Sequence, residues 1–122
     1  MRCYLAGPMR GYPKFNFPAF MEAASVLRKM GHEVFNPAER DLSKYDESVV
    51  SSPTGNLKTA ERRGFNLREA LSADLKWVCL KAEAVVLLPG WENSKGAGAE
   101  KATAHAIGIP VLLYEDLVKT NV

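Results

Sequence analysis

AVVLLPGWENSKGAGAEKATAHAIGIPVLLY, residues 84–114, decides the fold. Its first six residues form an apolar run typical of a buried strand, and residues 90–96 form a loop that contains glycine and serine. The alanine-rich sequence that follows predicts a helix ending at Gly108, and IPVLLY predicts another buried strand. A strand, a helix and a strand in this order form a crossover unit of a parallel sheet.

The N-terminal part of the chain predicts a second unit of the same kind. CYLAG at residues 3–7 and HEVFNP at residues 32–37 each predict a short strand. Between them, Asn16 is expected to cap a helix that begins at Phe17 and stops at Gly31. The two units predict an α/β domain, a three-layer Rossmann-like (flavodoxin-like) fold with a parallel sheet and helices on both faces.

The middle of the chain is less regular. Residues 38–65 are rich in charge and serine and contain a Ser-Pro-Thr-Gly turn, so they predict a variable loop or excursion without a readable structure. LREALSADLKWVCLK at residues 67–81 restores helical spacing, and Asp74 lies between Leu71 and Val78 on its apolar stripe. This pattern predicts a helix with an inward-facing carboxylate.

Composition narrows the class of protein. At 122 residues the chain predicts one domain spanning residues 1–122, and 47% hydrophobic with 25% charged residues is typical of a globular protein. The apolar runs are shorter than the roughly 20 residues of a membrane span, and no signal peptide is visible, so no membrane association and a cytoplasmic location are expected. A formal net charge of +2 predicts no direct nucleic-acid binding. Cys3 and Cys79 are expected to be reduced core residues.

The two loops that follow the strands leave the sheet at the same edge and should face one cleft. Backbone N–H groups around Ser94, Gly96 and Gly98 precede a helix and are candidates to bind a phosphate. In the first loop, at Arg10-Gly11, the arginine is a candidate to bind the same phosphate through its guanidinium. The loop spacing matches neither the Walker nor the dinucleotide fingerprint. A flexible connection and a solvated arginine are the alternatives.

Two carboxylates stand near this cleft. Glu100 lies close to the start of the helix, where the helix dipole alone favours an acidic residue, and Asp74 is alternatively the cap of a helix starting at Leu75. A carboxylate on an apolar stripe costs several kcal/mol unless it is paired or used. Two carboxylates beside an anion site point to glycosidic chemistry. His32 and His105 are isolated, so no metal and no cofactor is expected.

Three separated segments carry a resemblance to a known family. YLAGPMRG at residues 4–11, ADLKWVCLKAEAVVLLPGW at residues 73–91 and SKGAGAEKATAHAIGIPV at residues 94–111 resemble the nucleoside 2-deoxyribosyltransferase superfamily. The resemblance includes its small DUF4406 branch, which is frequent in phage genomes, so the host cytoplasm is the expected location if a phage encodes the chain. It covers most of the chain apart from the excursion.

Within that superfamily the sequence is most similar to the 5′-monophosphate N-glycosidases, at Asp74-Leu75-Lys76-Trp77 and at Ser94 through Glu100. The resemblance implies that Glu100 is the nucleophile on C1′ and that Asp74 orients the sugar or protonates the departing base. The residues that it implies for the 5′-phosphate are Ser94, Gly96, Gly98, Gly7, Arg10 and Gly11. Pro8 departs from this role because it lacks an N–H.

The expected reaction is hydrolysis of the N-glycosidic bond of a (deoxy)ribonucleoside 5′-monophosphate that carries a pyrimidine or modified pyrimidine. Tyr4 and Trp91 are weaker candidates for contacts with the base or sugar, because each is equally suited to packing. The alternatives are base exchange by a deoxyribosyltransferase, a non-catalytic nucleotide-binding protein and a purely structural domain. The resemblance also implies a homodimer or higher homo-oligomer in which a neighbour completes the site.

Overall fold

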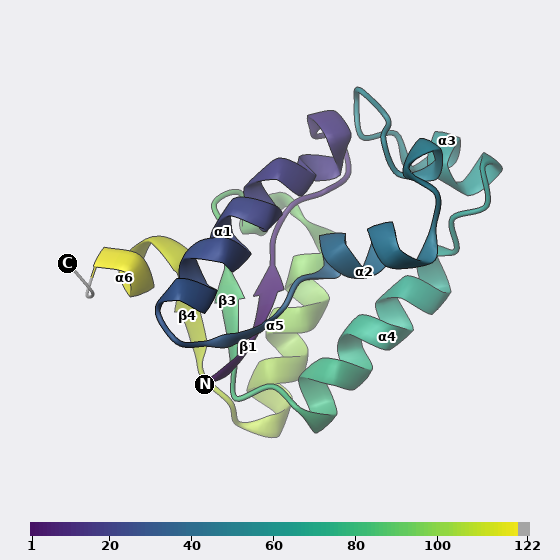
Figure 1. Cartoon of the computed structure of the whole chain (residues 1–122). Helices are drawn as coiled ribbons and strands as arrows, with labels where there is room; N and C mark the ends of the chain where they lie inside the picture. Colours follow the sequence, from purple (N-terminus) through teal and green to yellow (C-terminus); the bar gives the residue numbers. More distant parts are fainter. Residues whose placement is uncertain (120–122) are drawn as a thin grey trace.

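The computed structural model describes residues 1–119, which form a four-stranded parallel sheet flanked by helices (Figure 1). The strands are β1 (Arg2–Ala6), β2 (Glu33–Phe35), β3 (Ala84–Leu87) and β4 (Val111–Leu113). Their order is β2-β1-β3-β4, and each neighbouring pair is parallel. The chain places β2 on one side of β1, and β3 and β4 on the other. The point at which the strand order reverses therefore lies between β1 and β3, and α/β folds bind ligands at such switch points.

Helices cover both faces of the sheet. They are α1 (Phe17–Lys29), α2 (Pro37–Lys44), α3 (Leu57–Arg62), α4 (Leu67–Leu80), α5 (Lys95–Ile107) and α6 (Tyr114–Lys119). Helix α1 packs on one face, whereas α4 and α5 pack against each other on the other face. The predicted three-layer α/β fold is therefore confirmed. Helix α6 was not expected from the sequence.

Alternation along the strands decides which side chain meets which helix layer. In β1, Cys3 and Leu5 belong to the cluster on the α1 face, whereas Tyr4 and Ala6 belong to the cluster under α4 and α5. Strand β3 is divided in the same way, and all four of its residues are buried. Tyr4 is consequently fully buried on the α5 side of the sheet.

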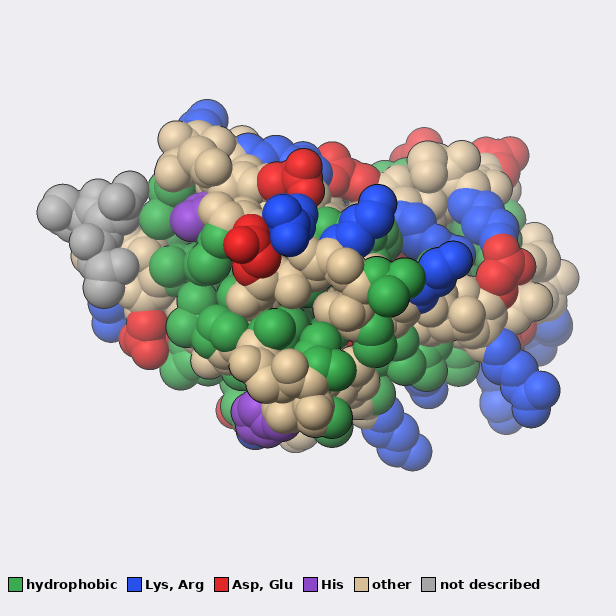
Figure 2. Space-filling view, turned by 90° about the horizontal axis from the view of Figure 1, so that it is seen from below, with side chains coloured by type: hydrophobic (Ala, Val, Ile, Leu, Met, Phe, Trp, Pro, Cys, Tyr) green, Lys and Arg blue, Asp and Glu red, His purple; other side chains and the backbone are tan. Residues whose placement is uncertain are grey.

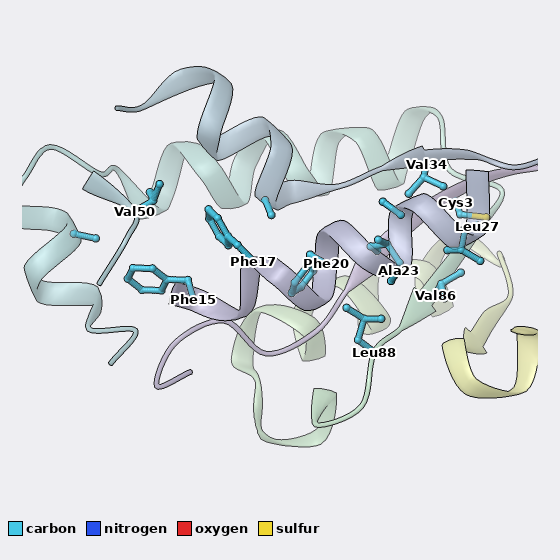
Figure 3. Close-up of a cluster of buried hydrophobic side chains, with 14 of the residues drawn as sticks. Cys3, Phe15, Phe17, Phe20, Ala23, Leu27, Val34, Val50, Val86 and Leu88 are labelled. Carbon is cyan, nitrogen blue, oxygen red and sulfur yellow. The ribbon is translucent and has the colours of Figure 1, made fainter. Parts of the chain in front are cut away.

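The larger cluster extends beyond the sheet toward the excursion. Figure 3 shows Phe15, Phe17 and Phe20 in a row between Val50 of the excursion and Leu88, the residue that follows β3. These five side chains are at most 8% exposed. Their burial joins the first loop, α1 and the excursion into one core.

The entry into α1 is an unusual turn. The helix begins at Phe17 as predicted, but Asn16 does not cap it with its side chain, which instead donates to the carbonyl of Pro8 at 3.0 Å. Lys14, Phe15 and Asn16 all have left-handed φ angles of 55°, 54° and 62°. Such a conformation costs about 1–2 kcal/mol per non-glycine residue, so burial of Phe15 and the Asn16 hydrogen bond must offset the strain.

Residues 38–65, for which the sequence predicted only an irregular excursion, contain most of α2 and the whole of α3. Helix α2 begins at Pro37 because the side chain of Asn36 accepts a hydrogen bond from the Ala38 N–H at 2.9 Å. Asn56 caps α3 in the same way by accepting from the N–H of Thr59. Asparagine caps therefore organise a segment whose apolar periodicity is weak.

The excursion also docks onto the first loop. The Gly11 N–H donates to the Gly55 carbonyl at 2.9 Å, and the Lys14 N–H donates to the Ser52 carbonyl at 2.9 Å. Gly55 has a φ of +67°, and a Cβ at this position would lie 2.3 Å from the Tyr12 carbonyl oxygen. Only glycine permits this close approach of the two backbones.

The surface carries mixed charge. Figure 2 shows Lys and Arg side chains interspersed with Asp and Glu on the face seen from below.

Both cysteines are free; Cys3 is buried as predicted, whereas Cys79 is exposed and the prediction of a core position for it is wrong. Among residues 1–119, every helix is too short or too polar to cross a membrane.

We expect Gly55→Ala to destabilise the protein by at least about 2 kcal/mol, because the added Cβ would displace the Tyr12 backbone. Gly64→Ala is the matched control, since Gly64 also has a positive φ (+109°) but nothing within 4 Å of the added Cβ. It should cost about 1 kcal/mol. Urea unfolding measures both. Equal losses of stability would show that the contact between the excursion and the first loop contributes nothing.

Candidate active site

A cavity of about 330 Å³ lies at the carboxyl ends of β1 and β3. This volume falls within the roughly 300–1,000 Å³ of small-molecule sites. The loop after β1 lines it with residues 7–10, and the segment after β3 lines it with residues 93–97. The prediction that the two loops face one cleft is confirmed.

Glu100 lies on α5 at the wall of this cavity and is only 6% exposed. The Tyr4 hydroxyl of β1 donates a hydrogen bond to Glu100 Oε2 at 2.6 Å, and this contact joins residues 96 positions apart in the sequence. Burial raises the pKa of Tyr4 well above its usual value, and the negative charges of Glu100 and Asp74 add to this rise. Tyr4 is therefore a hydrogen-bond donor at neutral pH.

Burial also raises the pKa of Glu100, to about 8. The Tyr4 hydrogen bond opposes this rise because it favours the ionised carboxylate, whereas the charge of Asp74 adds to it. A carboxyl group with a pKa near physiological pH can exist in both protonation states. Perturbed groups of this kind in a cavity are candidates for proton transfer or nucleophilic attack.

Asp74 lies within α4, which begins at Leu67, so the alternative that it caps a helix starting at Leu75 is excluded. Its carboxyl lines the same cavity, and its Oδ1 is a buried atom without a hydrogen-bond partner among the described residues. Burial raises the pKa of Asp74 to about 7. An unpartnered buried oxygen in a cavity wall is available to a ligand.

The N-terminus of α5 forms one side of the cavity. Ser94 caps the helix by accepting from the Ala97 N–H at 3.1 Å, and its hydroxyl also donates to the Gly7 carbonyl at 3.5 Å. The N–H groups of Lys95 and Gly96, which also line the cavity, have no partner within residues 1–119. Two free N–H groups at the positive end of a helix are a suitable anion site.

The other predicted binding residues divide into two groups. Arg10 is exposed at the rim and lines the cavity. Gly11, Gly98 and Trp91 do not line it. The N–H of Gly11 is bonded to the excursion, and the N–H of Gly98 donates to Ser94 within α5. The Trp91 ring lies under the Lys101 ammonium, 4.6 Å from its centroid.

Apolar side chains form a large part of the cavity wall. These side chains come from the first loop, α1, the excursion and the start of α4, and the members of this apolar wall are Met9, Phe15, Phe20, Leu57, Phe65, Leu67 and Leu71. Leu57 and Phe65 of this wall lie within residues 38–65, for which the sequence predicted no structure. Asn56 and Asn66, which cap α3 and α4, were the signals that could have placed them.

One known protein family matches the part of the chain that contains the cavity. The family described as "Domain of unknown function (DUF4406)" matches residues 1–113. The chain belongs to this family. The DUF4406 match includes every residue that lines the cavity, and it confirms the predicted similarity to the DUF4406 family. None of the curated proteins compared with the chain matches it. Within residues 1–119, no group of three His, Cys, Asp or Glu side chains is placed to hold a metal ion.

We expect Glu100→Gln to stabilise the protein at pH 9 relative to wild type, but not at pH 4. The pKa of Glu100 is raised from 4.5 to about 8 in the folded state. Below pH 4.5 the carboxyl is protonated in both the folded and the unfolded protein, so it does not reduce the free energy of unfolding. As the pH rises to 8, the unfolded protein loses this proton more readily than the folded one, and the free energy of unfolding falls. Glutamine removes this loss.

The change in the effect between the two pH values is expected to be on the order of 3 kcal/mol, measured by chemical unfolding. Glu92→Gln is the matched control, because Glu92 is an exposed glutamate in the preceding turn. The assignment of Glu100 as a buried, neutral carboxyl fails if both variants show the same pH dependence as wild type.

Proposed function

We propose that this protein hydrolyses the N-glycosidic bond of a (deoxy)ribonucleoside 5′-monophosphate with a pyrimidine or modified pyrimidine base. One observation carries the proposal: the buried Glu100 carboxyl, held by Tyr4, lines the same cavity as Asp74 and the N-terminus of α5. The similarity of three sequence segments to the nucleoside 2-deoxyribosyltransferase superfamily supports it. Two carboxyl groups flanking the scissile bond are the usual requirement of glycoside hydrolysis.

The 5′-phosphate of the substrate binds at the α5 terminus in this proposal. The free N–H groups of Lys95 and Gly96 donate to phosphate oxygens, and the Arg10 guanidinium at the rim supplies a positive charge. The Ser94 hydroxyl already caps the helix, so it positions these N–H groups and joins the phosphate after a rotation that releases Gly7. The sugar then lies between the α5 terminus and Glu100.

Glu100 attacks C1′ of the sugar. Because Oε2 accepts from Tyr4, the oxygen that forms the new C–O bond is Oε1. The C1′–N bond breaks at the same time, its electron pair leaves with the base, and Asp74 donates a proton to that base. Water then attacks C1′ of the glycosyl ester, Asp74 takes the proton of the water, and Glu100 leaves as a carboxylate. The products are the free base and the sugar 5-phosphate.

This mechanism requires an ionised Glu100 and a protonated Asp74. Burial leaves the pKa of Glu100, about 8, above that of Asp74, about 7, so this state is the minor singly protonated form of the pair, and the Tyr4 hydrogen bond to Glu100 increases its share. In this proposal the apolar wall excludes water from the departing base and provides a surface against which its ring packs.

The direct test incubates the purified protein with a panel of nucleoside 5′-monophosphates, unmodified and 5-substituted, and measures free base by chromatography. We expect release by wild type and by Glu92→Gln, and a loss of at least about 1,000-fold in Glu100→Gln with ligand binding retained. Added free base separates hydrolysis from base exchange, because exchange yields a new nucleotide. Unchanged turnover in Glu100→Gln, or no release from any nucleotide by wild type, overturns the proposal.

The pH dependence of kcat/KM is a further expectation. Activity should rise with a limb near pH 7 and fall with a limb near pH 8, because the reactive state of the Asp74–Glu100 pair holds one proton. Tyr4→Phe removes the hydrogen bond that favours ionised Glu100, so the alkaline limb should move to higher pH and the maximum should fall. An alkaline limb that stays in place in Tyr4→Phe contradicts the assigned role of Tyr4.

A further inference from the structure

Tyr12 of the first loop lines the main cavity and has no part in the proposed mechanism. Its side chain is partly buried, and its hydroxyl has no hydrogen-bond partner among residues 1–119. A phenol hydroxyl can both donate and accept hydrogen bonds. Because no protein group competes for it, the Tyr12 hydroxyl is available to a ligand in the cavity.

The backbone of Tyr12 is held in place from both sides. Its N–H donates to the Met9 carbonyl at 3.2 Å, and its carbonyl accepts from the Phe15 N–H at 2.9 Å. Gly55 of the excursion packs against the same residue, since a Cβ at Gly55 would lie 2.7 Å from the Tyr12 nitrogen. The ring therefore extends from a fixed point, and a ligand that binds its hydroxyl does not have to order the backbone first.

The side chain of Tyr12 reaches the loop between β3 and α5. A Cβ at Gly90 would lie 2.6 Å from the Tyr12 hydroxyl oxygen and 3.1 Å from Pro8 Cγ, so the hydroxyl and the proline ring both border Gly90. The carbonyl of Gly7, next to Pro8, accepts from the Ser94 hydroxyl that caps α5. The Tyr12 hydroxyl thus lies where the first loop meets the loop that leads into the N-terminus of α5.

Positive charges and free donors near this junction favour an anion. Arg10 and Lys95, the first residue of α5, are exposed and line the cavity. The N–H groups of Lys95 and Gly96 are free at the start of the helix. Pro8 has no N–H, so it cannot donate to an anion bound there. The Tyr12 hydroxyl, beside Pro8, is placed to supply a donor instead.

We propose that the Tyr12 hydroxyl donates a hydrogen bond to the 5′-phosphate of the substrate and thereby favours nucleoside 5′-monophosphates over free nucleosides. This inference rests on the proposed function for the identity of the ligand. A hydrogen bond to a charged phosphate oxygen is stronger than one between neutral groups. Loss of the hydroxyl should therefore weaken binding of phosphate-bearing ligands selectively.

Isothermal titration calorimetry in the Glu100→Gln background, which prevents turnover, tests the contact with thymidine 5′-monophosphate and thymidine. Tyr12→Phe keeps the ring and removes only the hydroxyl, so it should raise the Kd of the monophosphate at least about tenfold. The Kd of thymidine should not change. Tyr114→Phe is the matched control, because Tyr114 lies on α6 outside the cavity. It should change neither Kd.

An unchanged Kd of the monophosphate in Tyr12→Phe, or an equal loss of affinity for both ligands, overturns the proposal. Urea unfolding provides the structural control. The midpoint of Tyr12→Phe should equal that of wild type, because the hydroxyl has no protein partner to lose.

Gly90→Ala tests the position of the hydroxyl without removing it. The added Cβ would lie 2.6 Å from the hydroxyl oxygen, so the Tyr12 ring must shift. Gly108→Ala is the matched control, since both glycines have a positive φ (+89° and +79°) but a Cβ at Gly108 meets nothing within 4 Å. Gly90→Ala should weaken binding of thymidine 5′-monophosphate several-fold, and Gly108→Ala should not. Equal affinities in the two variants overturn the proposal.

Kinetics separate this inference from the proposed function. Tyr12→Phe should raise KM for the nucleotide that wild type cleaves about tenfold and leave kcat nearly unchanged, because the phosphate contact is present in both the ground state and the transition state. Base release by wild type with an unchanged KM in Tyr12→Phe overturns the role of Tyr12 alone. No base release from any nucleotide overturns the proposed reaction, whereas a selective loss of monophosphate binding in Tyr12→Phe supports the phosphate contact. No binding of the monophosphate by wild type overturns both.

Discussion

The hydrogen bond from the Tyr4 hydroxyl to Glu100 connects β1 to α5 at the wall of the cavity. Burial of a carboxyl group is expensive unless a donor accompanies it. Tyr4 reaches Glu100 because alternation along β1 points it to the α5 face and because β1 and β3 are neighbours. The hydrogen bond between Tyr4 and Glu100 therefore requires the central position of β1, the parallel register and the length of α5 before Glu100.

The rest of the cavity depends on a second constraint, which is the docking of the excursion onto the first loop. Three successive left-handed residues form the turn into α1, and the close backbone approach at Gly55 holds the loop on which they lie. Strain of this kind persists only where the surrounding packing fixes it. Phe15 of this turn and Phe65 of the excursion both line the cavity, so the strained loop and the excursion together shape its apolar wall.

The sequence predicted the parts of the fold in which apolar periodicity is strong. Both crossover units and the meeting of the two loops follow from buried strands and glycine stops. It could not place α2, because Asn36-Pro37 is equally typical of a strand end and of a helix cap. The same gap concealed Leu57 and Phe65 of the apolar wall. Gly98 was expected to donate to a phosphate, but inside a helix its N–H is bonded to the preceding turn.

Mass spectrometry of the protein quenched during turnover tests the central claim, that Glu100 is the nucleophile, most directly. We expect a covalent sugar-phosphate adduct that peptide mapping places on Glu100 and that disappears once the substrate is consumed. Release of base accompanied by an adduct on another residue would contradict the account, because Glu100 would then be a proton-transfer or binding group and the Tyr4 hydrogen bond would serve stability alone.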